Sequence, residues 1–474
     1  MHITNTLTGE KEEFIPGSLP VRMYVCGLTP KNEPHLGHAR LFVTNDVIRR
    51  YLEYRGYPVK YVQNFTDIDD KIIQAGLRDG IPPSEAAKRY TACYFRDMNA
   101  LAVRPADTYT YVTEFIPQII TFIQKLIEKG HAYVLEGVGD RDVYFATTSF
   151  PDYGKLSKRN EEAMEAGARI EPDERKHNPR DFALWKAAKP GEPWWNSPWG
   201  RGRPGWHIEC STMAIETLGE QIDIHGGGAD LIFPHHENEI AQSESLTGKP
   251  FAHYWIHTGL LQLGNEKMAH SGHFVTARSV LERTPAPALR LYLLSQSYRT
   301  PFTYLPEQVT AAIKRWRRWV KARQTAAEYA KDTPAPKREP EEFTRLREEF
   351  IAAMDDDFNT SGALAVIDTL VRRLNEMTSK LAKGREQEQR ELAAGLAVLD
   401  ELVGVLGISL NPALDIRRNI DDASRAEIEA LVAARTEARK AKNWQEADRL
   451  RKELEERFDV IVKDAPMGSN WEVK

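Results

Sequence analysis

Two histidines stand three residues apart in the segment HLGHAR, which starts at His35. The segment follows a turn and opens a predicted helix, where free backbone N–H groups and the positive helix end favour an anion. His35 and His38 add imidazole donors, and Gly37 lets a phosphate or a flat ring approach the backbone. We interpret the segment as a nucleotide site whose histidines stabilise charge on a phosphoryl group. The alternative is a polar helix start with two surface histidines.

A second set of residues has the composition of a zinc site. The set consists of Cys26, Cys210, His235 and Glu239. Two thiolates, an imidazole and a carboxylate are ordinary ligands for zinc. His235 and Glu239 are four residues apart and would share one face of a helix. His236 is three residues from Glu239, and this spacing fits one face of a helix equally well. Spacing therefore leaves the histidine ligand open, and buried structural cysteines are the alternative explanation for the thiols.

Two further segments have residues suited to a nucleotide. In HGGGAD (225–230), glycines let a base and ribose lie against the backbone, and Asp230 is placed to accept hydrogen bonds from ribose hydroxyls. In GNEKMAHSGHF (264–274), Lys267 would neutralise a leaving pyrophosphate if it faced a triphosphate. The alternative for the first segment is an ordinary glycine turn, and the alternative for Lys267 in the second is a solvated lysine.

The elements that position these groups alternate between strand and helix. The apolar runs 21–27 and 59–65 predict buried strands, and Cys26 and Thr66 fall at their carboxyl ends. A helix with Leu41, Val43, Val47 and Ile48 on its apolar face is expected between the strands. A second helix is expected to be capped by Thr66 and Asp67 and to end at Gly80. This order predicts a parallel α/β sheet, whose ligands bind beyond the carboxyl ends of the strands.

The rest of the chain changes character twice. The Pro-, Gly- and Trp-rich stretch from about 150 to 205 predicts an insertion, after which helix and strand alternate again. Residues 331–342 form the clearest linker. Two long amphipathic helices are expected at 342–384 and 386–405, and the tail from about 420 predicts charged helices followed by a strand pair.

Composition limits the class of protein. The 474 residues carry a formal charge of −5, so a nucleic-acid partner must be argued from local patches. No apolar run reaches the about 18 residues that a membrane span needs. The first twenty residues lack the basic start and apolar stretch of a secretory signal peptide, so we do not expect secretion. Three cysteines fit a reducing cytoplasm better than a disulfide scaffold. We therefore expect a cytoplasmic, multi-domain enzyme.

Two basic segments that contain tryptophan are candidates for RNA contacts: 313–323, and 435–452 with Arg439, Lys440, Lys442 and Trp444. Basic side chains position phosphates, and an exposed tryptophan stacks on an unpaired base. The alternative for each is a solvated helix in which tryptophan only packs.

Together these motifs resemble the cysteinyl-tRNA synthetases, a family of class I aminoacyl-tRNA synthetases. HLGHAR is similar to the family's HIGH motif and KMAHS to its KMSKS motif. NFTDIDDKI, DFALWKAAKPGEPWWNSPWGRGRPGWHIECS, IDIHGGGADLIFPHHENEIAQSES and DFNTSGALAVI resemble other family blocks in the same order. The resemblance covers nearly the whole chain.

The resemblance implies an α/β fold: a class I Rossmann-like catalytic domain with an insertion, a helical bundle and a small mixed α/β C-terminal domain. The implied boundaries are 1–110 and 201–260 for the two halves of the catalytic domain, 111–200 for the inserted connective region, 261–330 for the KMSKS-like loop and linking helices, 331–410 for the bundle and 411–474 for the anticodon-binding domain.

The resemblance also implies the reaction and its residues. Cysteine and ATP, with Mg²⁺, give cysteinyl adenylate and pyrophosphate, and the cysteinyl group then passes to the 3′ end of tRNA(Cys). One zinc ion on Cys26, Cys210, His235 and Glu239 would select the substrate thiolate over the hydroxyl of serine. Cys26, Thr66 and Trp206 would contact the amino acid, and Gly227 and Asp230 the adenosine. His35, Gly37, His38, Lys267 and His270 would lie at the phosphates. The family is usually monomeric.

Two departures from the family pattern stand out. KMAHSGHF is one residue shorter than the usual KMSKSLGNF and places His270 roughly where the second lysine is expected, which removes a permanent positive charge. CGLTPKNEPHLGH replaces the usual CGPTVYD start, and we hypothesise that Lys31 compensates for the lost charge. Three other functions fit parts of the pattern: a mycothiol-type cysteine ligase, which lacks the full C-terminal tail; a catalytically silent paralogue that binds tRNA or cysteine; and a zinc hydrolase.

Overall fold

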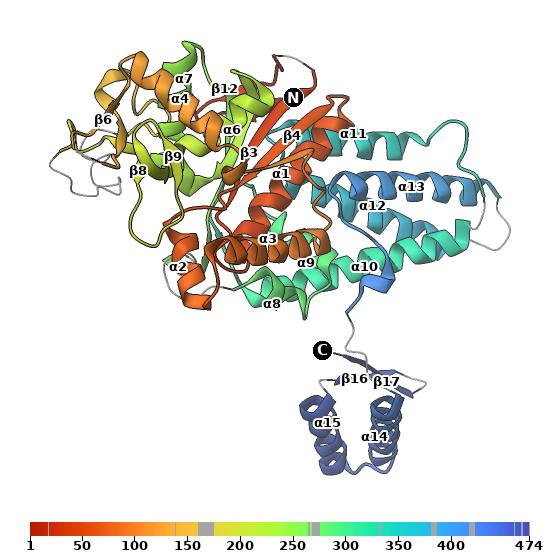
Figure 1. Ribbon diagram of the computed structural model, residues 1–474. Helices are drawn as coiled ribbons and strands as arrows, with labels where there is room; N and C mark the ends of the chain where they lie inside the picture. Colours follow the sequence, from red (N-terminus) through yellow and green to blue (C-terminus); the bar gives the residue numbers. More distant parts are fainter. Residues whose placement is uncertain are drawn as a thin grey trace. The chain divides into compact units, whose positions relative to one another are not determined.

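The chain forms two compact units, Met1–Leu410 and Asn411–Lys474 (Figure 1). The computed structural model describes residues 1–17, 19–137, 139–159, 175–263, 266–267, 275–330, 333–380, 386–416, 422–458, 460–465 and 468–473. Within these segments, every helix is too short or too polar to cross a lipid bilayer.

A five-stranded, all-parallel sheet organises the first unit. Its strands, in spatial order, are β12 (Ala252–Thr258), β11 (Ile222–Gly228), β3 (Val21–Leu28), β4 (Val59–Phe65) and β5 (Thr108–Tyr111). The predicted strands at 21–27 and 59–65 are confirmed as β3 and β4. The chain winds from β3 to β4 and β5, then returns to the other side of β3 with β11. The order therefore reverses at β3, which places a ligand crevice at the carboxyl ends of β3 and β11.

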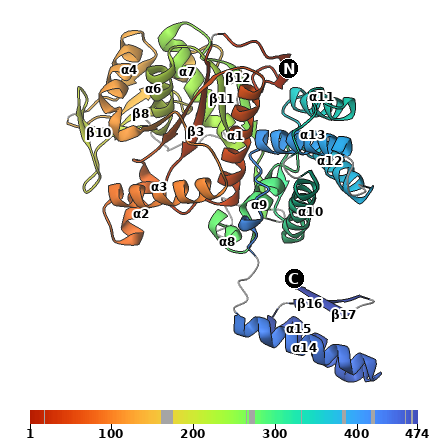
Figure 2. The ribbon, with the colours of Figure 1, turned by 90° about the vertical axis from the view of Figure 1, so that its right-hand side faces the viewer.

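Helices cover both faces of this sheet (Figure 2). One face carries α1 (Leu36–Tyr54) and α3 (Pro83–Ala100), and the other carries α4 (Ile116–Glu128), α6 (Trp206–Leu218) and α7 (Glu237–Thr247). Side chains of β3 alternate between the two cores: Met23 and Val25 pack with α1, while Tyr24 and Cys26 pack with α4 and α6.

The helix after β4 starts later than expected. It is α2 (Asp70–Asp79), its N-cap is Asp69, and the predicted capping by Thr66 and Asp67 is wrong. Asp67 instead accepts hydrogen bonds from the backbone and hydroxyl of Thr113. The predicted end of the helix at Gly80 is confirmed, with that residue in the left-handed conformation (φ 67°).

A second, antiparallel sheet lies in the region between β5 and α6. Its spatial order is β6 (Ala132–Val134), β7 (Val143–Phe145), β8 (Phe182–Ala187), β10 (Gly200–Pro204) and β9 (Trp195–Ser197), which leaves β9 at an edge. Arg203 of β10 forms ion pairs with Asp70 of α2 and Glu192, so this sheet is tied to the start of α2.

Short elements and a helical bundle complete the first unit. The short elements are β1 (His2–Thr4), β2 (Lys11–Glu13), β13 (Leu261–Leu263), β14 (Glu266–Lys267), β15 (Phe302–Thr303), α8 (Ala277–Leu281) and α9 (Ala286–Leu293). The bundle contains α10 (Pro306–Ala330), α11 (Glu341–Asp355), α12 (Thr360–Lys380) and α13 (Glu386–Val405). Arg290 of α9, fully buried, pairs with Asp46 of α1 and donates to the carbonyls of Leu101 and Leu406, which joins the bundle to the sheet.

Two expectations for the bundle are wrong. The single helix predicted at 342–384 is two helices, because Asp357 and Phe358 adopt left-handed φ values of 59° and 51° between α11 and α12. The tryptophans of 313–323 are not available for stacking. Trp316 and Trp319 are fully buried, and their indole N–H groups donate to the Ser409 carbonyl and to Asp368.

The second unit contains the predicted charged helices and strand pair. These are α14 (Asp422–Lys440), α15 (Trp444–Phe458), β16 (Val460–Ala465) and β17 (Gly468–Val473), and the two strands pair antiparallel. Ile428, Val432 and Leu454 pack against Val460 and Val462 as a small core of their own.

Candidate active site

One cavity of 440 Å³ opens at the carboxyl ends of the parallel strands. Cys26 comes from β3, Thr66 follows β4, Gly228 ends β11 and Thr258 ends β12. The predicted residues on its wall are Cys26, His35, Gly37, His38, Thr66, Trp206, Cys210, Asp230 and His235, together with Lys31. The strand order thus gathers predicted site residues that lie up to 209 positions apart in the sequence, from Cys26 to His235.

The four predicted metal ligands meet in this cavity's buried end. All their donor atoms lie within 4.8 Å of one another. Sγ of Cys26 is 3.6 Å from Sγ of Cys210 and 3.4 Å from Oε1 of Glu239, which is 3.0 Å from Nε2 of His235. Ligands at the corners of a zinc tetrahedron, with bonds of about 2.0–2.3 Å, lie about 3.3–3.8 Å apart. The two distances from Cys26 fall in this range and the Glu239–His235 distance is about 0.3 Å shorter, so the donor set has the chemistry and nearly the spacing that zinc requires.

The electrostatics of these groups favour a cation. Burial lowers the pKa of His235, but Glu239 and the Cys210 sulfur outweigh it and raise the pKa to about 10. Burial raises the pKa of Cys210, yet its hydrogen bonds with Cys26 and His235 bring it down to about 6. A buried thiolate and carboxylate thus hold a proton on His235, at a place where a metal ion would satisfy the same charges.

A layer of histidines surrounds this donor set. Nε2 of His225 lies 2.8 Å from Oε2 of Glu239, and Nδ1 of His207 lies 2.9 Å from Nδ1 of His235. His236 contacts His257 through Nδ1 at 2.8 Å, and its Nε2 is 3.9 Å from Glu239. Such contacts fix the orientation of ligating side chains.

A second overlapping group, Cys26, His225, His236 and Glu239, also satisfies the spacing of metal ligands. The two groups differ in access. Cys210 and His235 line the cavity, whereas His225 and His236 do not. Three members of the first group but only Cys26 of the second line the cavity, so the first group is better placed to present an ion to a molecule there.

Thr66 and Trp206 flank the same end of the cavity. The ring of Trp206 stacks on that of His235, with 4.4 Å between the centroids. The Thr66 hydroxyl donates to Glu209, a carboxyl whose pKa burial raises well above its ordinary range. Lys71 of α2 lies 5.1 Å from the Trp206 ring and adds a cation to the wall.

His35 and His38 form a stacked pair at the start of α1. Their ring centroids are 3.6 Å apart, and each Nδ1 accepts the backbone N–H of the other residue at 3.3 Å. Because both Nδ1 atoms accept, the proton of each neutral ring lies on Nε2. Burial, followed by the charges of His35 and Lys31, lowers the pKa of His38 well below 6.5. A Cβ at Gly37 would lie 2.9 Å from the His35 ring, so glycine is needed for this stacking.

The glycines of HGGGAD form the end of β11 rather than a loop after it. Gly227 packs against His236, where an added Cβ would lie 2.6 Å from the ring, and Gly228 lines the cavity in its place. Asp230 is exposed on the cavity wall. Lys267 belongs to β14, paired with Gln262 of β13, and His270 lies outside the described residues.

Sequence reasoning missed His207, His225, His257 and Lys71. For His225 a signal existed, because side chains along a strand alternate between the two faces of the sheet. His225 pairs with Tyr24 and lies on the face that Tyr24 and Cys26 share.

The predicted RNA-contacting residues lie in the second unit. Trp444, at the start of α15, is 58% exposed, and Lys442 precedes it in a left-handed turn. Lys440 pairs with Glu437, and Arg439 is partly exposed at the end of α14.

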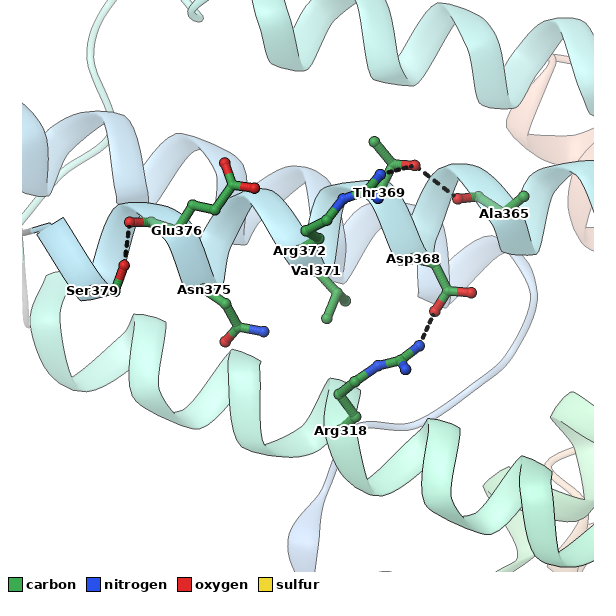
Figure 3. Close-up of a pocket in the computed structure, with 9 residues that line it drawn as sticks. All are labelled: Arg318, Ala365, Asp368, Thr369, Val371, Arg372, Asn375, Glu376 and Ser379. Carbon is green, nitrogen blue, oxygen red and sulfur yellow. Dashed lines mark hydrogen bonds and ion pairs between the residues drawn. The ribbon is translucent and has the colours of Figure 1, made fainter.

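A larger cavity of 640 Å³ lies between α10 and α12 of the bundle (Figure 3). Its walls carry the ion pair of Arg318 with Asp368, at 2.7 Å, and Arg372 and Glu376 farther along α12. It contains none of the predicted site residues, and no cysteine or histidine lines it. Within the described segments, the groups of potential metal ligands lie at the cavity at the sheet and not at this one.

Comparisons with known proteins agree with this fold. Residues 16–314 match the catalytic domain of class I (C) tRNA synthetases, residues 349–411 a DALR domain and residues 421–471 the cysteinyl-tRNA ligase anticodon-binding domain. A methionyl-tRNA synthetase of Mycobacterium tuberculosis, solved with methionyl-adenylate, shares the fold, with a TM-score of 0.62 and 17% identity over 82% of this chain and 90% of that chain. The chain therefore has the fold of a class I aminoacyl-tRNA synthetase.

Full-length relatives identify the family. A cysteine–tRNA ligase of Dehalococcoides mccartyi is 50% identical over 477 residues, covering 100% of both chains. Another, of Symbiobacterium thermophilum, is 49% identical over 481 residues and covers 99% of both. The chain belongs to the cysteine–tRNA ligase family and is a ligase.

Proposed function

We propose that the cavity at the carboxyl ends of β3 and β11 activates cysteine with ATP and transfers it to the 3′ end of tRNA(Cys). The observation that carries this proposal is the meeting, in one cavity, of a zinc-type donor set and the stacked His35–His38 pair at the start of α1. The first suits a thiol and the second suits a phosphate.

Cys26, Cys210, His235 and Glu239 would hold one zinc ion per chain. When bound, zinc would supply a Lewis acid that prefers a thiolate to a hydroxyl. His207 and His225 orient two of these ligands through the contacts described above. Because the ligand set faces the cavity, cysteine and serine can be distinguished without a separate editing site.

Thr66 and Trp206 would border the amino acid. The stacking of Trp206 on His235 and the hydrogen bond from Thr66 to Glu209 keep both side chains in place. Together with Cys26, they line the end of the cavity where the substrate side chain would lie.

The ATP phosphates would lie against the start of α1. Because Nδ1 of each ring accepts a backbone N–H, Nε2 of His35 and of His38 is the atom that can donate to a phosphoryl oxygen, and the lowered pKa of His38 lets that ring donate while neutral. The missing side chain of Gly37 permits this ring stacking. Asp230 would hold the adenosine together with Gly228, which lines the cavity in place of the predicted Gly227. Lys267 and His270 would approach the pyrophosphate, which Mg²⁺ accompanies. The cysteine carboxylate attacks the α-phosphorus, and the bond to the pyrophosphate oxygen breaks.

Residues 411–474 would read the anticodon, with Arg439, Lys440, Lys442 and Trp444 among the contacts. The exposed ring of Trp444 supports this assignment, because an exposed indole can stack on an unpaired base. We propose the other domain boundaries as the sequence analysis stated them, and a monomer that works in the cytoplasm. The three unpaired cysteines suit that compartment.

The test is an aminoacylation assay with purified protein, radiolabelled cysteine, ATP and tRNA(Cys), together with ATP–pyrophosphate exchange. We expect cysteine-dependent exchange and charged tRNA. Exchange without charging would contradict the transfer step, and cysteine binding without exchange would contradict the activity altogether. Serine in place of cysteine should support neither reaction at comparable concentration.

A further inference from the structure

The segment TDIDDK (66–71) turns the side chains of its two end residues to the cavity at the carboxyl ends of the strands. Thr66 and Lys71 line the cavity wall, whereas none of the three carboxylates between them does. Each of these carboxylates has another partner: Thr113 for Asp67, the backbone N–H of Lys71 for Asp69, and Arg203 and Lys186 for Asp70. The segment therefore presents a hydroxyl and an ammonium group to the cavity and no carboxylate, which suits an anionic ligand.

Lys71 stands at the end of the cavity where the metal-type donors meet. Its Nζ lies 5.1 Å from the centre of the Trp206 ring, and that ring stacks on His235 with 4.4 Å between the centroids. The ammonium group and one of the four donors are thus neighbours of the same side chain. In cysteine, three bonds separate the thiol sulfur from the carboxyl carbon. A cysteine whose sulfur reaches the donor set therefore brings its carboxylate into the surroundings of Lys71.

The cavity has a second cation at its other functional end. Lys31 and Lys71 are the two lysines on the described part of the cavity wall, and no arginine lines that part. The charge of Lys31 acts on His38, at the start of α1, where we place the ATP phosphates. Adenylation brings two anions together, the carboxylate and the α-phosphate. A cation beside the carboxylate offsets their repulsion and the cost of taking the carboxylate out of water.

We propose that the ammonium group of Lys71 binds the α-carboxylate of cysteine and directs one of its oxygens to the α-phosphorus of ATP. This inference rests on the proposed function and adds a substrate-binding residue to its first step. Lys71 neither takes nor gives a proton. The carboxylate oxygen forms its bond to the α-phosphorus while the bond to the pyrophosphate oxygen breaks, and Lys71 keeps its positive charge throughout. A thiol that has no carboxylate therefore binds without help from Lys71.

The first experiment uses calorimetry to measure Kd for cysteine and for cysteamine, which is cysteine without its carboxylate. The variants are Lys71→Met, which keeps the length of the side chain, and Lys71→Arg, which keeps the charge. Lys88→Met, at an exposed position of α3, is the matched control. The Kd for cysteine should rise about 10- to 100-fold in Lys71→Met, the usual effect of losing a hydrogen bond between charged groups. Lys71→Arg should recover most of this loss.

Cysteamine distinguishes contact with the carboxylate from support of the surrounding wall. Its Kd should be the same in the wild type, Lys71→Met and Lys88→Met, with equal metal content in all three proteins. If Lys71 acted only by holding Trp206 in place, cysteine and cysteamine would be weakened equally, and the inference would be overturned. An unchanged Kd for cysteine in Lys71→Met would overturn it as well.

The second experiment measures ATP–pyrophosphate exchange. In Lys71→Met, the KM for cysteine should rise while the KM for ATP stays unchanged. A rise in the KM for ATP alone would place Lys71 at the phosphates and contradict the inference. If the wild type binds neither thiol and supports no exchange, the proposed function fails and the inference fails with it. If the wild type exchanges normally and Lys71→Met does the same, only the inference fails.

Discussion

Nε2 of His225 lies 2.8 Å from Oε2 of Glu239, and both side chains are fully buried. The contact fixes the carboxylate whose other oxygen faces Cys26 and His235. His225→Gln shortens the reach to Glu239 and should lower zinc affinity about 10- to 100-fold, the usual effect of losing a partner of a metal ligand. Zinc affinity is measured by competition with a chromogenic chelator. An unchanged affinity would show that Glu239 is oriented without His225.

Cys210→Ser should weaken zinc binding more than the His225 variant does, because it removes a ligand rather than its support. Cysteine-dependent ATP–pyrophosphate exchange should fall with the zinc content. Cys93→Ser is the matched control, since Cys93 is partly buried but belongs to neither group of potential metal ligands. Removal of the metal by a chelator should reproduce the Cys210→Ser result in the wild type. Full exchange activity in metal-free protein would contradict the role assigned to zinc.

Lys31 is expected to assist the leaving pyrophosphate. It lines the cavity near His38, and Arg78 holds its segment by donating to the Lys31 carbonyl at 3.0 Å and to Asn32 at 2.7 Å. Lys31→Ala should lower the exchange rate about tenfold, because a positive charge near the phosphates is lost. Lys31→Arg should retain most of the rate.

The control for this prediction is Lys88→Ala, which removes an exposed lysine of α3 that does not line the cavity. Transfer of cysteine from preformed cysteinyl adenylate to tRNA should be equal in Lys31→Ala and the wild type, since pyrophosphate has already left. An unchanged exchange rate in Lys31→Ala would show that Lys31 does not compensate for the positive charge lost where His270 replaces the expected lysine.

His257 should make the fold sensitive to acid. Burial, and then the charge of His225, lowers the pKa of His257 from 6.5 to about 3. Above pH 6.5 the folded and unfolded chains both keep this ring neutral, so it has no effect on stability there. Between pH 6.5 and about 3 only the unfolded chain binds the proton, and stability falls by about 1.4 kcal/mol per pH unit from this side chain.

The measurement is the difference in Tm between the wild type and His257→Gln. The variant should be less stable at pH 7.5, because it loses contacts with His236 and Thr6. The difference in Tm should be smaller at pH 5.5, because there the unfolded wild type binds a proton at His257 that the folded wild type does not, and this destabilises the wild type. A difference independent of pH would contradict the lowered pKa.

The sequence predicted the central part of this site well, for a geometric reason. Residues that follow parallel strands meet at one edge of the sheet, so Cys26 and Thr66 are placed by the strand pattern alone. His35 and His38 are placed by the start of α1, which follows β3. These relationships depend on local periodicity, which a single sequence records.

Contacts between distant segments were harder to predict. The break between α11 and α12 has no local proline or glycine signal. Asp357 keeps its left-handed conformation because its carboxylate accepts from Thr4 and Tyr298, residues far away in the chain. Likewise, the amphipathic pattern of 313–323 does not reveal whether a tryptophan faces solvent. Burial of Trp316 is settled by packing in the bundle and by its hydrogen bond to the Ser409 carbonyl.

Sγ of Cys26 and Oε1 of Glu239 are in contact although 213 positions separate the two residues. The proposed zinc site is therefore incomplete in a chain still emerging from the ribosome, until β11 and α7 have been synthesised and have docked beside β3. Loading of the proposed zinc would then be a late event in biogenesis, and a shortage of zinc would affect nearly finished chains rather than early folding intermediates.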